Sequence, residues 1–344
     1  MTTMKAVRWT ATDQVDVVET AVPEVPAGWA LVKVAYNGIC GTDLAILHGK
    51  HPRAAHGLVL GHEMSGWVER SGASGPAVGT LVVVEPLISC GQCRSCKNGL
   101  SHVCRSLGLY GIDAAGGMAQ YVALPPEVLH AVPDAVSPRT ATLAEPLAVA
   151  VHAVELSQMA VGDVVAVYGA GPIGVLTALV ARHAGASAVV ITEPSPWRRE
   201  VAARLGFTVV APDSTMAATL APLTDGEGAD TTFDSAAHPS VAADLAATTR
   251  VRGRIVVVGV YKQPTAIDLQ AVCFKEQSVV GVRVYTSANM ARAIELIAGG
   301  ELGLERFPTK AFDLTDVAAA FDAATSGQDC FKVLVTPLPG KDDA

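Results

Sequence analysis

Four cysteines lie close together in one short segment, which runs from Cys90 to Cys104 with the spacing Cys-x2-Cys-x2-Cys-x7-Cys. Four thiolates from one segment are the ligand set of a closed, tetrahedral zinc site. Such a site has no open position for a substrate, so its role is to brace the chain around it. We therefore predict a structural zinc lobe held by Cys90, Cys93, Cys96 and Cys104.

Two other interpretations of this segment stay open. Disulfides need an oxidising compartment, and the start of the chain, Met-Thr-Thr-Met-Lys-Ala-Val, lacks the basic and apolar regions of a secretory signal. A nucleic-acid-binding zinc ribbon is disfavoured by the net charge of −8, which would repel a polyanion. We expect a reduced, cytoplasmic protein that binds neither nucleic acid nor membrane.

The length and composition of the chain favour two domains. The chain has 344 residues, of which 50% are hydrophobic and 17% charged, so it can form sizeable cores. The most apolar region, residues 143–181, is interrupted by Glu145, His152, Glu155 and Asp163 before a membrane-spanning length is reached. We therefore expect a soluble protein without transmembrane helices.

The first third of the chain is rich in β-branched runs separated by proline and glycine, which predicts strands at residues 15–18 and 30–35. Cys40 follows, and His62 and Glu63 lie twenty-two and twenty-three residues beyond it. Thiolate, imidazole and carboxylate together can hold a zinc ion with an open position. Taken singly, each of the three is more often a buried small residue or a surface side chain.

A glycine motif follows a buried strand in the second part of the chain. Residues 164–168 read as a parallel strand, and Gly169-Ala-Gly171-Pro172-Ile173-Gly174 opens a helix that runs to residue 182. A second strand at residues 188–192 ends at Glu193, nineteen residues beyond Gly174. This order of strand, glycine turn, helix and strand predicts a dinucleotide site, although a turn that serves packing alone is the alternative.

In such a turn, each of the three glycines has a structural role. Gly169 permits the tight turn, Gly171 lets the backbone approach a pyrophosphate, and Gly174 lets the helix pack on its strand. The carboxylate of Glu193 is placed to bind the adenosine ribose and to repel a 2′-phosphate, which favours NAD over NADP. Arg198 lies close enough in sequence to soften that preference.

These motifs stand in one order along nearly the whole chain, and the sequence resembles the zinc-dependent medium-chain dehydrogenases/reductases. It is similar to their polyol branch, which includes sorbitol, (R,R)-butanediol and threonine dehydrogenases. The resemblance implies an α/β protein with a GroES-like, partly open β-barrel and a Rossmann domain with a doubly wound parallel sheet. It implies a catalytic domain at 1–150, an NAD-binding domain at 151–286 and a return to the catalytic domain at 287–344.

The resemblance also implies roles for individual residues. The implied catalytic residues are Cys40, Thr42, His62, Glu63 and Glu145, all but Thr42 as ligands or occasional ligands of a catalytic zinc. For Glu145 the alternative is an acid that is favoured near a helix start by the helix dipole alone. The implied cofactor-binding residues are Gly169, Gly171, Pro172, Ile173, Gly174, Glu193, Arg198 and Arg283.

The last predicted strand of the dinucleotide domain covers residues 277–285. Arg283 and Tyr285 stand two apart in it, so we expect them on one strand face, lining the cleft for cofactor and substrate. Between the glycine motif and this strand, residues 230–234 and 254–259 read as further parallel strands. Ordinary residues at a strand end are the alternative for Arg283 and Tyr285.

One departure from the family pattern concerns the proton relay. Thr42 matches the hydroxyl that begins the relay in relatives, but Ala45 stands where many of them carry a histidine. His48, His51 and His56 follow in the same loop and are candidates to replace it. A solvated loop histidine is the simpler interpretation of each.

We therefore expect an enzyme with two zinc ions per chain, one catalytic and one structural, that transfers a hydride from a secondary alcohol to NAD. The expected substrate is a polyol, vicinal diol or sugar-like alcohol. A threonine, aminocyclitol or sugar-acid dehydrogenase is the alternative, and a non-enzymatic protein that keeps the fold is a remote one. The resemblance further implies a homo-oligomer, either a tetramer or a dimer.

Overall fold

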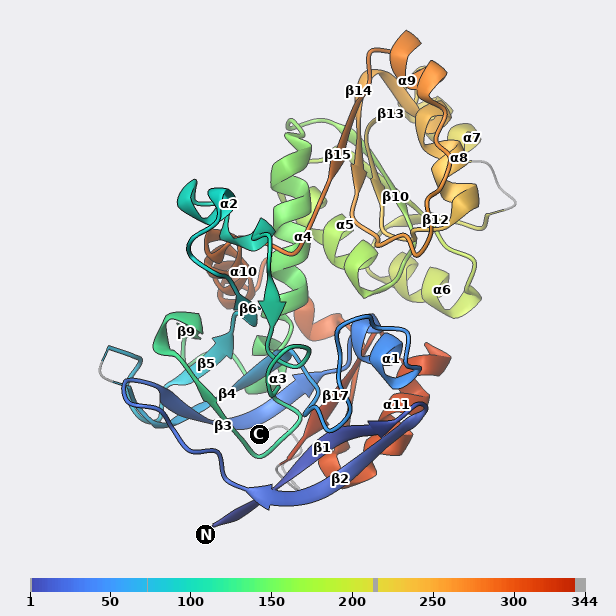
Figure 1. Ribbon diagram of the computed structural model, residues 1–344. Helices are drawn as coiled ribbons and strands as arrows, with labels where there is room; N and C mark the ends of the chain where they lie inside the picture. Colours follow the sequence, from blue (N-terminus) through green and yellow to red (C-terminus); the bar gives the residue numbers. More distant parts are fainter. Residues whose placement is uncertain (1, 73, 213–215, 338–344) are drawn as a thin grey trace. The chain divides into compact units, whose positions relative to one another are not determined.

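A computed structural model of the chain describes residues 2–72, 74–212 and 216–337. The chain divides into two compact units, which are shown in Figure 1. The first unit comprises Met1–Glu145 and Thr286–Ala344, and the second comprises Pro146–Tyr285. The second unit is thus an insertion in the first, and its two boundaries fall at residues 145/146 and 285/286 where we expected 150/151 and 286/287.

The first unit is built on a largely antiparallel sheet, as its β-branched start predicts. Along the sheet the order is β16 (Thr309–Asp313), β17 (Lys332–Thr336), β3 (Ala30–Gly38), β4 (Glu63–Arg70), β5 (Leu81–Val84) and β9 (Leu129–Ala131), with β8 (Tyr121–Leu124) also paired to β3. Two separate antiparallel pairs are β1 (Thr3–Ala11) with β2 (Gln14–Ala21) and β6 (Leu87–Ile88) with β7 (Gly108–Leu109). Val32, Val34 and Val82 are fully buried in the core of this sheet.

The first unit also contains several helices, of 4 to 13 residues. They are α1 (Gly41–Leu47), α2 (Arg94–Lys97), α3 (Pro138–Ala141), α10 (Ser287–Gly299) and α11 (Val317–Ser326), with 3-10 turns η1 (Ser101–Val103), η2 (Pro126–Val128), η4 (Leu304–Arg306) and η5 (Leu314–Asp316). Helix α10 begins with a capping box in which Thr286 and Asn289 bond to each other's backbone N–H groups. Within the part of the chain that the structure describes, no helix is both long and apolar enough to cross a membrane.

The second unit is a six-stranded, fully parallel sheet, which confirms the predicted doubly wound fold. The strand order is β12 (Thr208–Val210), β11 (Ala188–Thr192), β10 (Val164–Tyr168), β13 (Ala229–Asp234), β14 (Thr249–Val257) and β15 (Ser278–Gly281). Its helices are α4 (Ala144–Ser157, which begins two residues before the unit), α5 (Pro172–His183), α6 (Pro196–Arg204), α7 (Met216–Leu220), α8 (Pro239–Thr248) and α9 (Leu269–Phe274), with the turn η3 (Ala221–Leu223). The order reverses between β10 and β13, and ligands of such sheets bind at this switch point.

Strand β10 lies in the middle of the parallel sheet. Its three central residues, Val165, Ala166 and Val167, have no exposed surface, because helices cover both faces of a parallel sheet. The run of apolar residues in the sequence therefore reflects burial on two sides. The strand ends at Tyr168, directly before the glycine motif.

The last strand of the second unit is shorter than predicted. Strand β15 ends at Gly281, and Val284 has a left-handed backbone with φ of 43°. This bend sends the neighbouring side chains in different directions: Arg283 is exposed and Tyr285 is fully buried. The prediction that the two residues share one strand face is wrong.

Candidate functional site

A thiol, an imidazole and a carboxyl group meet in the first unit. Cys40 precedes helix α1, His62 precedes strand β4, and Glu63 is the first residue of that strand. One donor atom from each lies within 4.8 Å of the others, and the side chains of His62 and Glu63 are almost fully buried. This set of three donors fits a zinc ion that keeps an open position.

The backbone around this centre depends on glycine. Gly38 at the end of β3 pairs with Glu63, and a Cβ on Gly38 would lie 2.1 Å from the Glu63 carboxylate oxygen Oε2. Gly61 has a left-handed φ of +97°, and a Cβ there would meet the side chain of Asn37 at 2.5 Å. Gly38 therefore leaves space for the Glu63 carboxylate, and Gly61, directly before His62 in sequence, leaves space for the buried Asn37 side chain.

A buried lysine completes the environment of Glu63. Lys332, the first residue of β17, is 4% exposed, and its Nζ lies 2.6 Å from Glu63 Oε1 and 3.3 Å from the carbonyl oxygen of Ile39. The other carboxylate oxygen, Oε2, is buried and has no hydrogen-bond partner among the described residues. One oxygen of Glu63 is thus neutralised by Lys332, while the other remains for a metal ion.

Asp43 is a second residue whose importance the sequence did not reveal. It is fully buried, its Oδ2 accepts a hydrogen bond from the Cys40 backbone N–H at 2.8 Å, and its Oδ1 lies 3.8 Å from His62 Nδ1. Burial raises the pKa of Asp43. Burial alone would lower the pKa of His62, but the charges of Asp43 and Cys40 outweigh it and raise that pKa well above its usual value. The negatively charged groups around His62 therefore favour a positive charge at its ring.

Thr42 and Glu145 lie at the margin of this centre. The Thr42 hydroxyl is 3.8 Å from Cys40 Sγ. Glu145, in the first turn of α4, is 8% exposed, and its charge contributes to the raised pKa of His62. It does not belong to the group of donors within 4.8 Å, so its direct ligation stays a prediction.

The three loop histidines considered for the relay each have a structural contact. His48 Nδ1 lies 2.5 Å from Asp13 Oδ1, and His51 Nδ1 accepts hydrogen bonds from backbone N–H groups of its own loop. The ring of His56 stacks on Trp9 with a centroid distance of 4.2 Å. These contacts account for the positions of the three histidine rings without a role in proton transfer. A proton relay through one of them stays a prediction.

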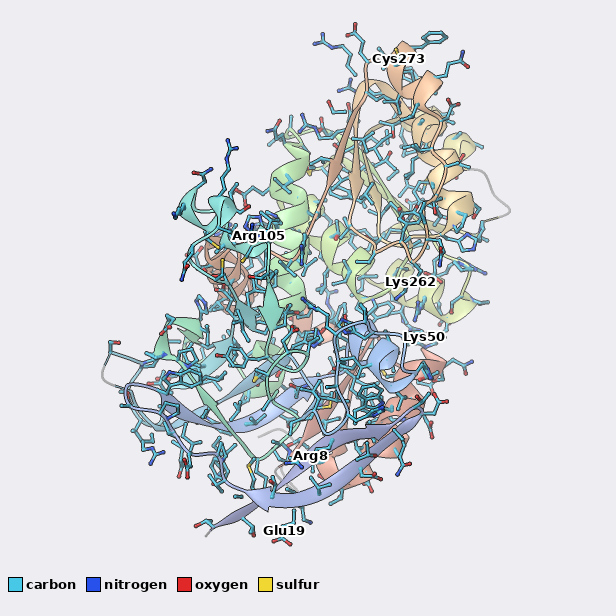
Figure 2. All side chains as sticks on the ribbon, viewed as in Figure 1. Arg8, Glu19, Lys50, Arg105, Lys262 and Cys273 are labelled. Carbon is cyan, nitrogen blue, oxygen red and sulfur yellow. The ribbon has the colours of Figure 1, made fainter. Side chains whose placement is uncertain are left out.

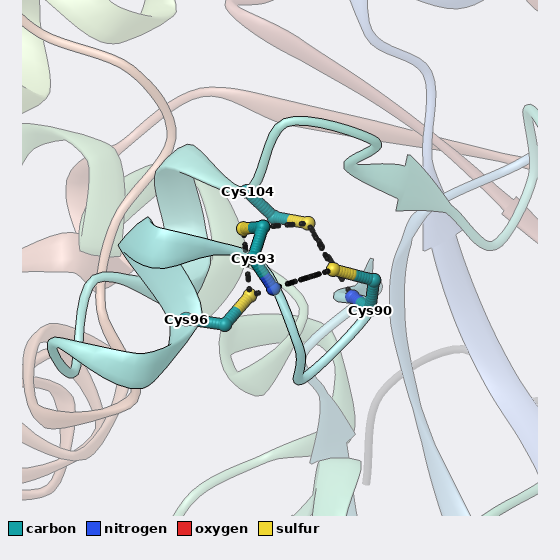
Figure 3. Close-up of side chains that lie close together, drawn as sticks. All are labelled: Cys90, Cys93, Cys96 and Cys104. Carbon is teal, nitrogen blue, oxygen red and sulfur yellow. Dashed lines mark hydrogen bonds between the residues drawn. The ribbon is translucent and has the colours of Figure 1, made fainter.

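The four-cysteine lobe closes around a common centre, as Figure 3 shows. Four Sγ–Sγ distances among Cys90, Cys93, Cys96 and Cys104 are 3.4, 3.5, 3.9 and 4.0 Å. Tetrahedral zinc with Zn–S bonds of about 2.3 Å requires sulfur atoms roughly 3.8 Å apart. These separations fit zinc and are far longer than a disulfide bond of about 2.0 Å.

The acidity of the lobe's thiols also fits a metal ion. Backbone N–H groups of Gln92 and Cys93 lower the pKa of the Cys90 thiol to about 6. Burial and the neighbouring thiols raise the pKa of Cys96 to about 11. Cys96 is therefore a neutral thiol in the metal-free lobe, and a cation such as zinc would be needed to hold all four groups as thiolates.

The glycine motif forms a turn between β10 and α5. Gly169 has φ of +97°, and a Cβ on Gly174 would lie 1.9 Å from the carbonyl oxygen of Gly169. Gly171 is the N-cap of α5, and Pro172 and Ile173 form its first turn. The unpaired N–H groups at the start of this twelve-residue helix can hold a phosphate.

Glu193 lies beside this turn at the end of β11. Its Oε2 accepts a hydrogen bond from the Ala170 N–H at 2.7 Å, and its Oε1 accepts one from the Ser195 N–H at 2.9 Å. Glu193 and Arg198 both line a cavity of about 890 Å³ in the second unit, together with Gly169 and Gly171. Arg283 is not among the residues that line it.

Comparison with known proteins gives two family matches. Residues 26–134 match the alcohol dehydrogenase GroES-like domain, and residues 172–299 match the zinc-binding dehydrogenase domain. Among curated relatives, 2-dehydro-3-deoxy-L-galactonate 5-dehydrogenase of Pseudoalteromonas atlantica is 37% identical, covering 96% of this chain and 98% of its own. L-Threonine 3-dehydrogenase of Bacillus subtilis is 35% identical, covering 93% of this chain and 94% of its own.

Two solved structures share the fold with a TM-score of 0.91 each. A Sinorhizobium meliloti zinc-binding dehydrogenase with NADP bound is 31% identical, covering 98% of this chain and all of its own. An Escherichia coli alcohol dehydrogenase in complex with NADH is 29% identical, also covering 98% of this chain and all of its own.

Proposed function

This chain belongs to the zinc-dependent medium-chain dehydrogenases/reductases of the polyol and threonine type, and we propose that Cys40, His62 and Glu63 form its catalytic centre. The enzyme oxidises a secondary alcohol to a ketone with a nicotinamide dinucleotide as acceptor. The observation that carries the proposal is that the donor atoms of Cys40, His62 and Glu63 lie within 4.8 Å of one another, and that one buried oxygen of Glu63 has no hydrogen-bond partner among the described residues.

Zinc bound by these residues would supply a Lewis acid that lowers the pKa of the substrate hydroxyl. The protein's own residues prepare the centre for it. Asp43 accepts a hydrogen bond from the Cys40 backbone, which fixes Cys40, and its other oxygen lies 3.8 Å from His62 Nδ1. Lys332 holds Glu63 by one oxygen and limits the negative charge of the centre. Thr42, near Cys40, is placed to pass the hydroxyl proton outward, and we assign it that role.

The second zinc of our proposal is held by the four-cysteine lobe, giving two ions per chain. Its four donors fill the coordination sphere, so it braces the segment from Cys90 to Cys104 and takes no part in the reaction.

We assign NAD as the preferred acceptor. The Glu193 carboxylate lines the cavity beside the glycine turn, which supports this, because an acidic residue at the end of the second strand typically binds the ribose hydroxyls and repels a 2′-phosphate. Like charges in contact cost several kcal/mol, so we expect kcat/KM to favour NAD over NADP by about 100-fold or more. Replacing Glu193 by glutamine should reduce this ratio to about 10-fold or less. The matched control is Glu227→Gln, which removes an exposed carboxylate of the same unit. A wild-type enzyme that prefers NADP would contradict the assignment.

The substrate class that we propose is a sugar-like secondary alcohol, either a polyol or a sugar acid. The 37% identity to a sugar-acid dehydrogenase supports it, and the 35% identity to a threonine dehydrogenase makes threonine the second candidate. The test is a panel of polyols, vicinal diols, cyclitols, sugar acids and threonine, assayed for NAD reduction by the purified enzyme. Reduction of NAD by threonine alone would rule out the sugar-like class.

We further propose that the chain forms a homo-oligomer through the outer edge of its parallel sheet. Strand β15 is the edge strand, and large apolar residues near it are exposed: Val279 is 46%, Leu269 66% and Phe274 79% exposed. Figure 2 labels Cys273, next to Phe274 on the exposed helix α9. Such an edge with an apolar surround is suited to pairing with a second copy.

If the edge strand β15 forms the oligomer interface, charged substitutions on or near it should change the mass of the protein in solution. Changing Val279 to lysine and Phe274 to glutamate together should convert the oligomer to monomers, because charges at a paired edge are desolvated without partners. Light scattering after size-exclusion chromatography measures the mass. Val161→Lys, at an apolar residue that is 86% exposed elsewhere in the unit, should leave the mass unchanged. An unchanged mass in the double variant would exclude this edge as the interface.

We also propose a cytoplasmic location. All seven cysteines are free thiols in the structure, and the lobe binds zinc only while its thiols stay reduced.

A further inference from the structure

The cavity of the second unit extends beyond the residues that the proposed function uses. The glycine turn and Glu193 account for the pyrophosphate and the ribose of a dinucleotide. The remaining wall includes Pro212, shortly after β12, and Val241, Ala243 and Asp244 of helix α8. We expect the base attached to the ribose to lie against this part of the wall.

Asp244 is held in place more firmly than an ordinary helix carboxylate. The hydroxyl of Tyr168, a residue only 4% exposed at the end of β10, donates a hydrogen bond to Asp244 Oδ2. The Thr248 hydroxyl, one turn further along α8, lies 3.2 Å from the same oxygen and 2.6 Å from the Tyr168 hydroxyl. Burial raises the pKa of Tyr168, so the phenol keeps its proton. These contacts fix the orientation of the carboxylate.

The second oxygen of Asp244, Oδ1, accepts no hydrogen bond from any residue that the structure describes. Asp244 is exposed, so this oxygen is open to the cavity. It presents an acceptor on a wall that carries the apolar side chains of Val241, Ala243 and Pro212 and the polar side chain of Ser240. A flat ring can pack on those apolar groups, and a donor on the edge of the ring can replace the water that otherwise solvates the carboxylate. Adenine has such an edge, because its 6-amino group donates two hydrogen bonds. Hypoxanthine carries a carbonyl oxygen at that position, and its donor on this edge, N1–H, lies one ring atom away, so a carboxylate fixed opposite the 6-position would face a second acceptor.

We propose that Asp244, oriented by Tyr168, accepts a hydrogen bond from the 6-amino group of the adenine ring and so selects adenine dinucleotides over hypoxanthine dinucleotides. The inference rests on the proposed function, since it requires that a dinucleotide occupies this cavity. Asp244 is a specificity residue for the cofactor, and hydride transfer does not involve it.

Equilibrium binding of two reduced cofactors tests the proposal. The zinc-loaded enzyme is titrated with NADH and with reduced nicotinamide hypoxanthine dinucleotide, and the nicotinamide fluorescence reports the two dissociation constants. Wild type should bind NADH about 10-fold more tightly, the lower end of what a hydrogen bond to a charged group provides at a partly exposed site. Asp244→Ala should bring the two constants within about 2-fold of each other, mainly by weakening NADH.

Two further variants sharpen the test. Tyr168→Phe leaves the Asp244 carboxylate in place but removes the hydrogen bond that orients it. The preference for NADH should then lie between that of wild type and that of Asp244→Ala. Glu227→Gln removes an exposed carboxylate outside the cavity and should keep the wild-type preference. Equal binding of both cofactors by wild type, or an unchanged preference in Asp244→Ala, overturns the assignment of Asp244. Failure of wild type to bind either cofactor is a separate result, which overturns the dinucleotide site itself.

Discussion

Replacing Cys40 by alanine should lower kcat/KM for alcohol oxidation by about 1,000-fold or more, because a bound Lewis acid contributes several kcal/mol to transition-state stabilisation. The same change should reduce the zinc content from two ions per chain to one. The reason is structural: Cys40 is one of three donors within 4.8 Å, whereas the four donors of the lobe form a separate group. Elemental analysis and steady-state kinetics of the purified variant measure both effects.

Two other cysteines provide controls for this prediction. Cys104→Ala should also remove one zinc ion, but its main effect should be a lower free energy of unfolding, because the lobe's zinc contributes to folding. Cys273→Ala, at an exposed residue outside both donor groups, should change neither zinc content nor activity. Retention of both zinc ions in Cys40→Ala would rule out the catalytic centre as assigned.

Replacing Lys332 by methionine should destabilise the zinc-free protein by about 3–5 kcal/mol, the usual cost of removing one partner of a buried ion pair. The Lys332 Nζ and Glu63 Oε1 atoms are 2.6 Å apart, and both side chains are at most 5% exposed, so no water can replace the ammonium group. Zinc would neutralise Glu63 in its place, and the loss should be smaller in the zinc-loaded protein. Urea unfolding with and without a chelator measures the difference.

A double variant and an exposed pair make the Lys332 test specific. Combining Lys332→Met with Glu63→Gln removes both charges and should recover much of the lost stability. Arg204→Met breaks an exposed pair with Glu200, whose side chains are 60% and 67% exposed, and should cost about 0.5 kcal/mol or less. Equal losses in Lys332→Met and Arg204→Met would show that the Lys332–Glu63 pair does not stabilise the fold.

The parts of the site that the sequence predicted well are those formed by neighbouring residues. The lobe from Cys90 to Cys104 and the turn from Gly169 to Gly174 each lie within one short segment, so spacing alone indicates their geometry. The zinc-dependent dehydrogenase fold followed from the order of these motifs. Cys40 and Glu63 meet because β3 and β4 pair directly, with Gly38 opposite Glu63.

The sequence did not predict the residues that reach the site from far along the chain. Lys332 is 269 positions from Glu63, and its strand β17 joins β3 through antiparallel pairing of Leu334 and Val335. No local pattern distinguishes it from a lysine at the start of any strand. Asp43 lay inside a quoted motif, but its burial against Cys40 and His62 is a tertiary property.

The sequence also did not predict that β15 ends at Gly281. The run from Val279 to Tyr285 alternates like a strand, and left-handed backbone is normally signalled by glycine or asparagine, whereas here it occurs at the β-branched Val284. The strand's end therefore depends on how the chain turns toward the fully buried Tyr285.

The insertion of the second unit into the first has a consequence for how the enzyme is made. Strands β16 and β17, and with them Lys332, leave the ribosome only after the whole of Pro146–Tyr285 has been synthesised. The dinucleotide unit can fold while its host is still incomplete, since domains generally fold as units during synthesis. Until β17 has been synthesised, Glu63 lacks the ammonium group of Lys332 as a partner. Zinc bound early by the nascent chain would neutralise the Glu63 carboxylate in its place. Metal supply during translation would then set the yield of active enzyme.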